Sequence, residues 1–206
     1  IGVTRPGGLS ARLSRQVVRK FGLTTDDVTI HPIGGSQTER YQAMVGNVVQ
    51  AILVTPPLDV RAKRDGFNVI YRLIDLEIPF IYSSLLTSYK MLRERPETVQ
   101  RMVAALAEAV HFVEKNPDKA KAAIAKAMRV KDEEALQSSY NVYAKEIVDR
   151  TMVVPGKSVS EAVDIARETG TVVRRKPEDL YDNSFVNNLE KSGFLKELWG
   201  SENYRR

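Results

Sequence analysis

Three short polar segments carry the residue types that hold a small anion or another strong hydrogen-bond acceptor. Each contains one hydroxyl residue, Ser10, Ser36 or Thr55, beside glycine or proline. Each also leads into a helix-forming stretch, and the free N–H groups and dipole at a helix N-terminus favour negative charge. Glycine lets the backbone approach a ligand closely. The chemistry that these segments predict is binding of a small molecule. The alternative is that they serve only as helix caps and turns.

The residue types that catalysis needs are sparse and ungrouped. The two histidines, His31 and His111, lie outside any H-x-x-x-H or H-E-x-x-H pattern, so we expect neither to bind a metal. The absence of cysteine excludes disulfides, thiolate catalysis and zinc–cysteine sites. No nucleophile elbow, P-loop or dinucleotide fingerprint occurs. We therefore predict no catalytic residue, no metal and no cofactor.

The composition is that of a soluble globular protein. The chain has 206 residues, of which 43% are hydrophobic and 28% charged. The net charge is +5, but the basic residues form no stripe interleaved with aromatic residues, so nucleic acid is not a predicted partner. No apolar run approaches the roughly 18 residues that crossing a bilayer requires.

The first 75 residues alternate strands with helices, which predicts a parallel sheet with right-handed crossovers. Ser36 and Glu39 have the spacing of a capping box at the start of a helix. The nearly continuous apolar run from Val48 to Val54 is typical of a strand covered on both faces. We expect strands over residues 1–4, 28–30, 48–54 and 68–73, and helices over 9–21, 37–45 and 57–64.

The remainder, residues 76–206, is predicted to be mainly helical and to form a second region. Pro96 opens a helix, and Asn116-Pro117 ends it. Ser158 with Glu161 predicts another capping box. Further helices are expected over 118–128, 132–148 and, after Pro177, in a final pair. One apolar stripe of the Pro96 helix contains Val99, Met102, Val103, Leu106, Val110 and Val113. The crossover from Ile74 to Tyr82, which contains Pro79, is the predicted hinge between the two regions.

The predicted binding site lies at the carboxyl ends of the strands, where ligands bind in parallel α/β sheets. The hydroxyls of the three segments and nearby backbone N–H groups are expected to hold the polar head of the ligand. The candidate residues are Thr4, Arg5, Gly7, Gly8, Leu9, Ser10, Gly35, Ser36, Thr38, Thr55 and Pro56.

Four stretches, in this order, resemble the nitrate, sulfonate, taurine and thiamine-precursor family of type II periplasmic solute-binding proteins. They are IGVTRPGGLSARLSRQVVRKFGL, DVTIHPIGGSQTERYQAMVGNVVQAILVTPP, RPETVQRMVAALAEAVHFVEKNPDKAKAAIAKAMRV and KPEDLYDNSFVNNLEKSGFL. The sequence departs from the family at Gln50, where an Asp-Ala pair is usual.

The resemblance implies an α/β clam-shell fold. Residues 1–75 would be one parallel-sheet lobe, and residues 76–206 the mainly helical region of the other. An N-terminal lobe segment of such proteins is missing from this sequence, so we expect the chain to be part of a longer protein. We also expect the chain to dimerise in order to cover the apolar surface left without that segment.

The function that the resemblance implies is that of an extracytoplasmic, non-enzymatic protein. It would capture a small anionic or polar molecule in the periplasm and deliver it to the permease of an ABC transporter. One alternative is a ligand-sensing module of the same fold. Another is an enzyme similar to the synthase of the thiamine pyrimidine precursor, a branch whose cysteine-rich motif has no counterpart here.

Overall fold

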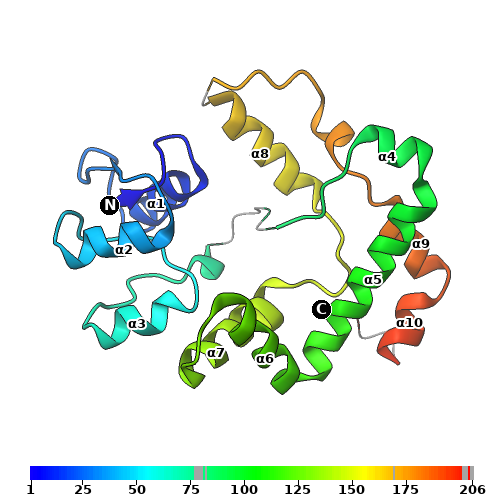
Figure 1. Ribbon diagram of the computed structural model, residues 1–206. Helices are drawn as coiled ribbons and strands as arrows, with labels where there is room; N and C mark the ends of the chain where they lie inside the picture. The colour runs from blue at the N-terminus through cyan, green and yellow to red at the C-terminus, as the bar shows by residue number, and fades with distance from the viewer. Residues whose placement is uncertain (77–80, 82, 169, 201–203, 205–206) are drawn as a thin grey trace. The chain divides into compact units, whose positions relative to one another are not determined.

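The computed structural model describes the chain except for residues 77–80, 82, 169, 201–203 and 205–206 (Figure 1). The chain divides into two compact units. Unit 1 comprises Ile1–Ile78 with Asp132–Ser138, and unit 2 comprises Pro79–Lys131 with Ser139–Arg206. That these units correspond to the lobes of a clam-shell stays a prediction. Most of the predicted hinge, Ile74 to Tyr82, lies outside the described residues.

The sheet of unit 1 is small and parallel. Strand β1 (Gly2–Val3) pairs with β2 (His31–Pro32), with Gly2 opposite His31. On its other side β1 is bridged in parallel to Ile52, and the Gly2 N–H donates to the Ala51 carbonyl at 2.8 Å. β1 is therefore the middle of three parallel segments, which confirms an α/β architecture with a parallel sheet.

Close packing explains the glycine at the centre of this sheet. A Cβ at Gly2 would lie 3.0 Å from Cγ2 of Val49 and 3.1 Å from Cγ2 of Ile52. Both contacts are too short for a side chain to be added without movement of the neighbours. Val49 is buried in the main apolar cluster of unit 1 with Tyr41 and Met44. The absent side chain thus lets the third segment approach β1.

One helix follows each of the three parallel segments, as expected. These helices are α1 (Leu9–Lys20), α2 (Gln37–Val45) and α3 (Leu58–Arg64), and a 3₁₀ helix covers Leu73–Asp75. The predicted ends of the first two helices are confirmed to within one residue. Connections of this kind leave every helix N-terminus at the carboxyl end of the preceding strand segment.

The predicted strands were wrong in extent. The second strand lies at His31–Pro32 rather than at 28–30, and the run 48–54 pairs only through Ile52. Val48 is 62% exposed because its N–H donates to the Ala43 carbonyl at 2.8 Å, which ties it to the end of α2. Residues 68–73 form no strand in the described part of the chain, and Ile70 is 64% exposed.

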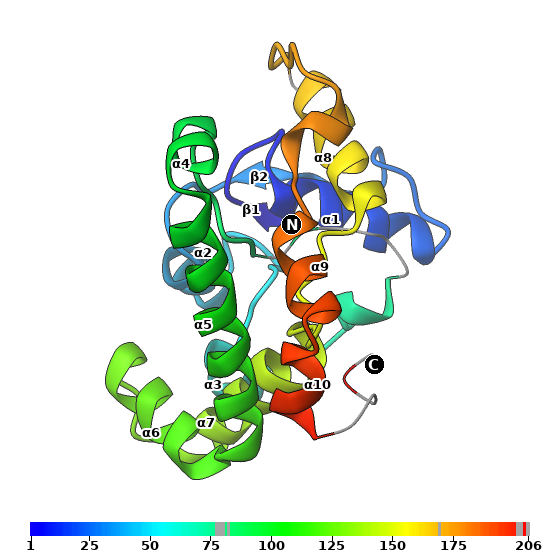
Figure 2. The ribbon, with the colours of Figure 1, turned by 90° about the vertical axis from the view of Figure 1, so that its right-hand side faces the viewer.

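Unit 2 is helical in its described residues. Figures 1 and 2 both show α9 (Ser184–Lys191) and α10 (Phe194–Trp199) alongside α5 (Pro96–Lys115). Unit 2 also contains α4 (Tyr89–Glu94), α6 (Pro117–Met128), α8 (Gly156–Glu168) and a 3₁₀ helix over Pro177–Leu180. The main core cluster joins α5 to the two last helices through Val103, Leu189 and Trp199.

Three expectations for residues 76–206 need correction. α8 begins at Gly156, so Ser158 lies inside the helix and is buried instead of capping it. The predicted apolar stripe of α5 is wider than its buried face, because Met102 is 56% exposed and Leu106 is 43% exposed. The helix predicted over 132–148 consists of α7 (Glu133–Tyr140) followed by a π-helix (Asn141–Ile147).

None of the helices in the described part of the chain combines the length and the apolar character that crossing a membrane would require. Exposed apolar side chains are nevertheless present, including Leu86 at 86% and Val172 at 79%. Dimerisation of the chain stays a prediction.

Ion pairs attach the distant segment Asp132–Ser138 to unit 1. The Arg64 guanidinium contacts the Asp132 carboxylate at 2.5 Å and the Glu134 carboxylate at 2.5 Å. The Ser138 hydroxyl donates to the Asp59 carboxylate at 2.7 Å. The hydrogen bond from Arg64, followed by that from the Ala135 N–H, lowers the pKa of Asp132.

We predict that Arg64→Met loosens this segment and removes part of its pH dependence. Because the folded pKa of Asp132 lies below its unfolded value of about 3.9, its contribution to stability is present above that pH and is lost as pH falls through the folded pKa. Amide protection factors over residues 133–138, measured by hydrogen exchange, should fall in Arg64→Met at neutral pH. Lys63→Met, which removes an exposed charge from the same helix, is the control. Equal protection in wild type and Arg64→Met would show that the ion pairs of Arg64 do not hold this segment.

Candidate functional site

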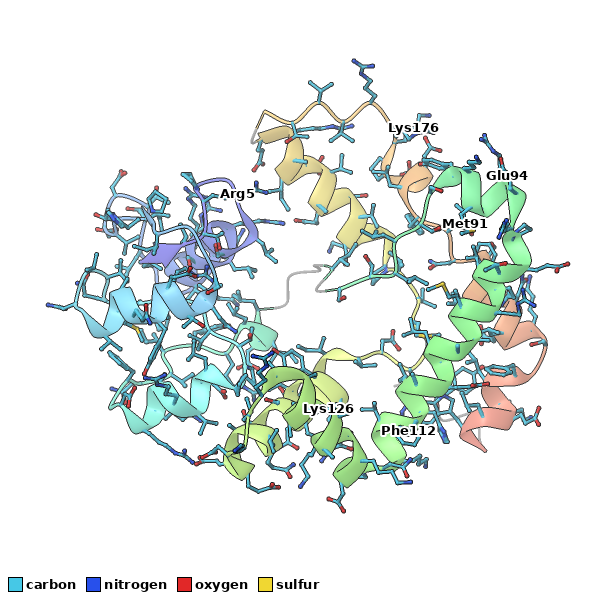
Figure 3. The ribbon with its side chains drawn as sticks, viewed as in Figure 1. Arg5, Met91, Glu94, Phe112, Lys126 and Lys176 are labelled. Atoms are coloured by element: carbon cyan, nitrogen blue, oxygen red, sulfur yellow. The ribbon has the colours of Figure 1, made fainter. Side chains whose placement is uncertain are left out.

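The carboxyl ends of the three parallel segments of unit 1 open into loops at one edge of the sheet. The first loop runs from Thr4 to the start of α1, the second covers residues 33–36, and the third covers residues 53–57. Figure 3 labels Arg5 in the first loop. This edge is where parallel α/β sheets bind ligands.

The first loop is closed by reciprocal hydrogen bonds between Thr4 and Ser10. The Thr4 N–H donates to Ser10 Oγ at 3.0 Å, and Ser10 Oγ donates to Thr4 Oγ1 at 3.3 Å. Thr4 Oγ1 accepts a second hydrogen bond, at 3.1 Å, from Nη1 of Arg40. A hydroxyl has two acceptor sites and one proton. Both acceptor sites of Thr4 are therefore used, and the proton of this exposed hydroxyl remains for a ligand.

The second loop is organised by the predicted capping box, which is confirmed. The Ser36 hydroxyl accepts from the Thr38 N–H at 3.2 Å, and the Glu39 carboxylate accepts from both the N–H and the hydroxyl of Ser36. These bonds, that from the hydroxyl first, lower the pKa of Glu39. Gly35 has φ +57° and lies so close that a Cβ would be 2.6 Å from Glu39 Oε2. The N-terminus of α2 thus already has a negatively charged partner, the carboxylate of Glu39.

The third loop is fixed by a side chain from α2. Gln37 Oε1 accepts from the Thr55 N–H at 2.9 Å and from the Thr55 hydroxyl at 3.2 Å. The hydroxyl proton of Thr55 is consumed by this contact, so in this arrangement Thr55 can offer a ligand only an acceptor. Pro56, which follows, is buried.

The structure brings together the candidate residues of the first loop, and the candidate residues of the second and third loops lie at the same edge of the sheet. Arg5 and Gly7 are exposed, whereas Gly8 is buried beside Arg5, whose Cγ would lie 3.0 Å from a Cβ on Gly8. Leu9 is 45% exposed at the first position of α1. Contact of any of these residues with a ligand stays a prediction.

Two residues that hold this edge together were missed from the sequence. Arg40 joins the first two loops, since its Nη1 donates to Thr4 Oγ1 and also to the Gly35 carbonyl at 3.2 Å. Gln37 joins the second loop to the third through Thr55. The sequence did contain an indication for Arg40. A cation close to a helix N-terminus interacts unfavourably with the helix dipole, which indicates that another contact holds the side chain there.

A separate cavity of about 520 Å³ lies within unit 2. Its polar lining is largely engaged already: the Tyr204 hydroxyl donates to Glu190 at 3.0 Å, and Asp149 accepts from the N–H and hydroxyl of Thr151, each at 2.8 Å. Val186 and Leu195, which also line it, belong to the apolar core. We therefore place the candidate site at the sheet edge. In the described residues no group of three or more acidic, histidine or cysteine side chains is arranged to hold a metal ion.

Comparison with known proteins identifies one family. The family model described as NMT1/THI5 like matches residues 1–120, which include all of the sheet edge and its three loops. Searches among curated proteins and among solved structures found no match.

We predict that Ser36→Ala lowers the free energy of unfolding by about 1 kcal/mol, because it removes the acceptor for the Thr38 N–H. Ser36→Gly should cost only a few tenths of that amount, since glycine is tolerated at the N-cap. Urea unfolding of both variants measures the difference. If Ser36→Ala is as stable as the wild type, the capping box does not stabilise α2.

Proposed function

We propose that this chain, which belongs to the NMT1/THI5-like family of type II periplasmic binding proteins, captures a small molecule outside the cytoplasm and delivers it to an ABC importer. The ligand would lie at the sheet edge of unit 1. Its contacts would come from the first loop above all, with the Thr4 hydroxyl as donor and the Ser10 hydroxyl as acceptor.

One observation carries this proposal. Three loops that are far apart in sequence are held at one edge by two side chains of α2: Arg40 donates hydrogen bonds to Thr4 and Gly35, and Gln37 accepts one from the Thr55 N–H. Rigid support of this kind reduces the loss of conformational entropy when a ligand binds.

The chemistry of the chain supports binding over catalysis. The family consists mostly of substrate-binding proteins and includes some enzyme-like members. This chain has no cysteine, whereas the enzyme branch that it resembles carries a cysteine-rich motif. The hydroxyls at the sheet edge are bonded to one another, to an arginine, to a glutamine and to a capping carboxylate. No described hydroxyl there contacts a histidine that could activate it as a nucleophile.

We predict that the protein purified from its own organism retains one small molecule per chain. Native mass spectrometry should detect the complex, and release of the compound gives its mass. Deleting the gene should reduce cellular uptake of that compound. A protein without bound compound, together with uptake that is unchanged in the deletion strain, would contradict the proposal.

We further predict that Thr4→Val weakens binding of the retained compound by roughly two- to twelvefold, the loss of one hydrogen bond. Valine keeps the shape of threonine, but it neither donates a proton to the ligand nor accepts the hydrogen bonds from Ser10 and Arg40, so this range is a lower bound. Thr25→Val, at an exposed position away from the sheet edge, is the matched control and should bind as the wild type does. Calorimetric titration of both variants decides the point, and equal affinity in Thr4→Val would exclude the Thr4 hydroxyl from the site.

A further inference from the structure

The net positive charge of the chain is concentrated in one surface helix of unit 2 and its flanks. Residues 115–131 contain six of the 31 basic residues but only one of the 26 acidic residues, Asp118. The rest of the chain therefore carries 25 residues of each sign, and this stretch accounts for the whole net charge of +5. It comprises the last residue of α5, Asn116, all of α6 and the three residues that follow α6. A charge excess confined to one short stretch favours association with a negatively charged partner.

The acidic residues that flank this stretch are engaged with arginines elsewhere in the fold. Before it, the Glu114 carboxylate accepts hydrogen bonds from Nε and Nη2 of Arg150. After it, Asp132 pairs with Arg64. These carboxylates therefore do not neutralise the basic side chains beside them in sequence.

Within the stretch, most of the positive charge is unpaired. Asp118 is balanced by Lys121, whose Nζ lies 3.6 Å from its carboxylate. The other five basic residues form no ion pair with any residue that the structure describes. All five are exposed. Their charges are thus available to a partner outside the chain.

Helix α6 presents one face to the core of unit 2 and the opposite face to solvent. Its buried residue, Ala120, packs with Tyr140 and Ala144. Figures 1 and 2 both show α6 on the side of α5 away from α9 and α10. Four exposed residues have the i, i+3, i+4, i+7 spacing of a single helix face. We call them the lysine face: Lys119, Ala122, Ala123 and Lys126.

Two exposed apolar side chains flank the lysine face. Phe112, in the last turn of α5, is 46% exposed, and Nζ of Lys119 lies 5.8 Å from the centre of its ring. Met128, at the end of α6, is 42% exposed. Figure 3 labels Phe112 and, on α6, Lys126. Unpaired lysines beside exposed apolar side chains suit the surface of an anionic membrane, where the lysines meet lipid phosphates and the apolar groups enter the headgroup layer.

We propose that the lysine face, with Phe112 and Met128, docks the chain on the surface of an anionic phospholipid membrane. The alanines between the two lysines allow the helix to approach a flat surface closely. Five of the six basic residues of the stretch are lysines, which are flexible point charges, whereas recognition of nucleic acids favours the planar fork of arginine. This inference goes beyond the proposed function, because membrane docking is separate from solute capture and is measured without a solute.

Co-sedimentation of the full chain with vesicles tests the docking surface. Vesicles of phosphatidylglycerol and phosphatidylcholine, mixed in about a 1:2 ratio, should bind the protein at low ionic strength and release it as salt is added. Vesicles of phosphatidylcholine alone should not bind it. Equal binding to both kinds of vesicle would contradict the proposal. Equally tight binding to a duplex DNA oligonucleotide would also overturn it, because the surface would then accept any polyanion.

A matched pair of double variants locates the surface. Lys119→Gln together with Lys126→Gln should weaken binding to the anionic vesicles about 25-fold, because each basic residue near an anionic leaflet contributes about fivefold in affinity. Glutamine is a good helix former, so α6 should be retained. Lys157→Gln together with Lys191→Gln removes two exposed lysines from α8 and α9 and should bind nearly as the wild type does. Unchanged binding in the first variant, or equal losses in both, overturns the docking surface.

A fluorescent label examines the same face without removing any charge. The chain has no cysteine, so the single thiol of Ala123→Cys can be labelled with an environment-sensitive fluorophore. Anionic vesicles should shift the emission of this label to shorter wavelength. The same label at Thr25→Cys, in an exposed acidic turn of unit 1, should not respond. An unchanged emission at position 123 in the presence of bound vesicles would place the membrane contact elsewhere, and the proposal would be wrong.

Discussion

The hydrogen bonds that Nη1 of Arg40 makes to Thr4 and Gly35 are the interaction on which the order of the loops at the sheet edge of unit 1 depends. The parallel segments of unit 1 are only two residues long where they are regular strands, so ladder bonds alone fix little of the loops that follow. The side chain of Arg40 joins the first two loops, and Gln37 extends the same connection to Thr55 in the third. Helix α2 therefore positions all three loops at this edge of the sheet.

This arrangement distinguishes hydroxyl groups that look alike in sequence by the partner that takes each proton. Ser36 directs its hydroxyl proton to Glu39, and Thr55 directs its own to Gln37. Thr4 accepts hydrogen bonds from Ser10 and Arg40 and keeps its proton. Loops that are cross-linked in this way lose little conformational freedom on binding. The arrangement buries the Arg40 guanidinium against neutral hydrogen-bond partners, and the adjacent Glu39 carboxylate interacts with it electrostatically.

The alternation of helices and strand segments, and the capping box at Ser36, could be predicted because both depend on local sequence. The extent of the strands could not. Val48 reads as part of an apolar strand, yet its N–H closes the end of α2, and that choice depends on the backbone turn at Asn47, which has φ +55°. The role of Arg40 was missed because its partners lie in loops that only the folded sheet brings together. The need for glycine at position 2 could not be predicted either, because it arises from the close approach of Ile52 in the folded chain.

A crystal structure of the protein with its co-purified compound tests the central claim most directly. The account predicts electron density for the compound at the sheet edge of unit 1, with a polar group of the compound within hydrogen-bonding distance of the Thr4 hydroxyl. Density for the compound in the cavity of unit 2 beside Asp149 and Glu190, with the three loops empty, would contradict it.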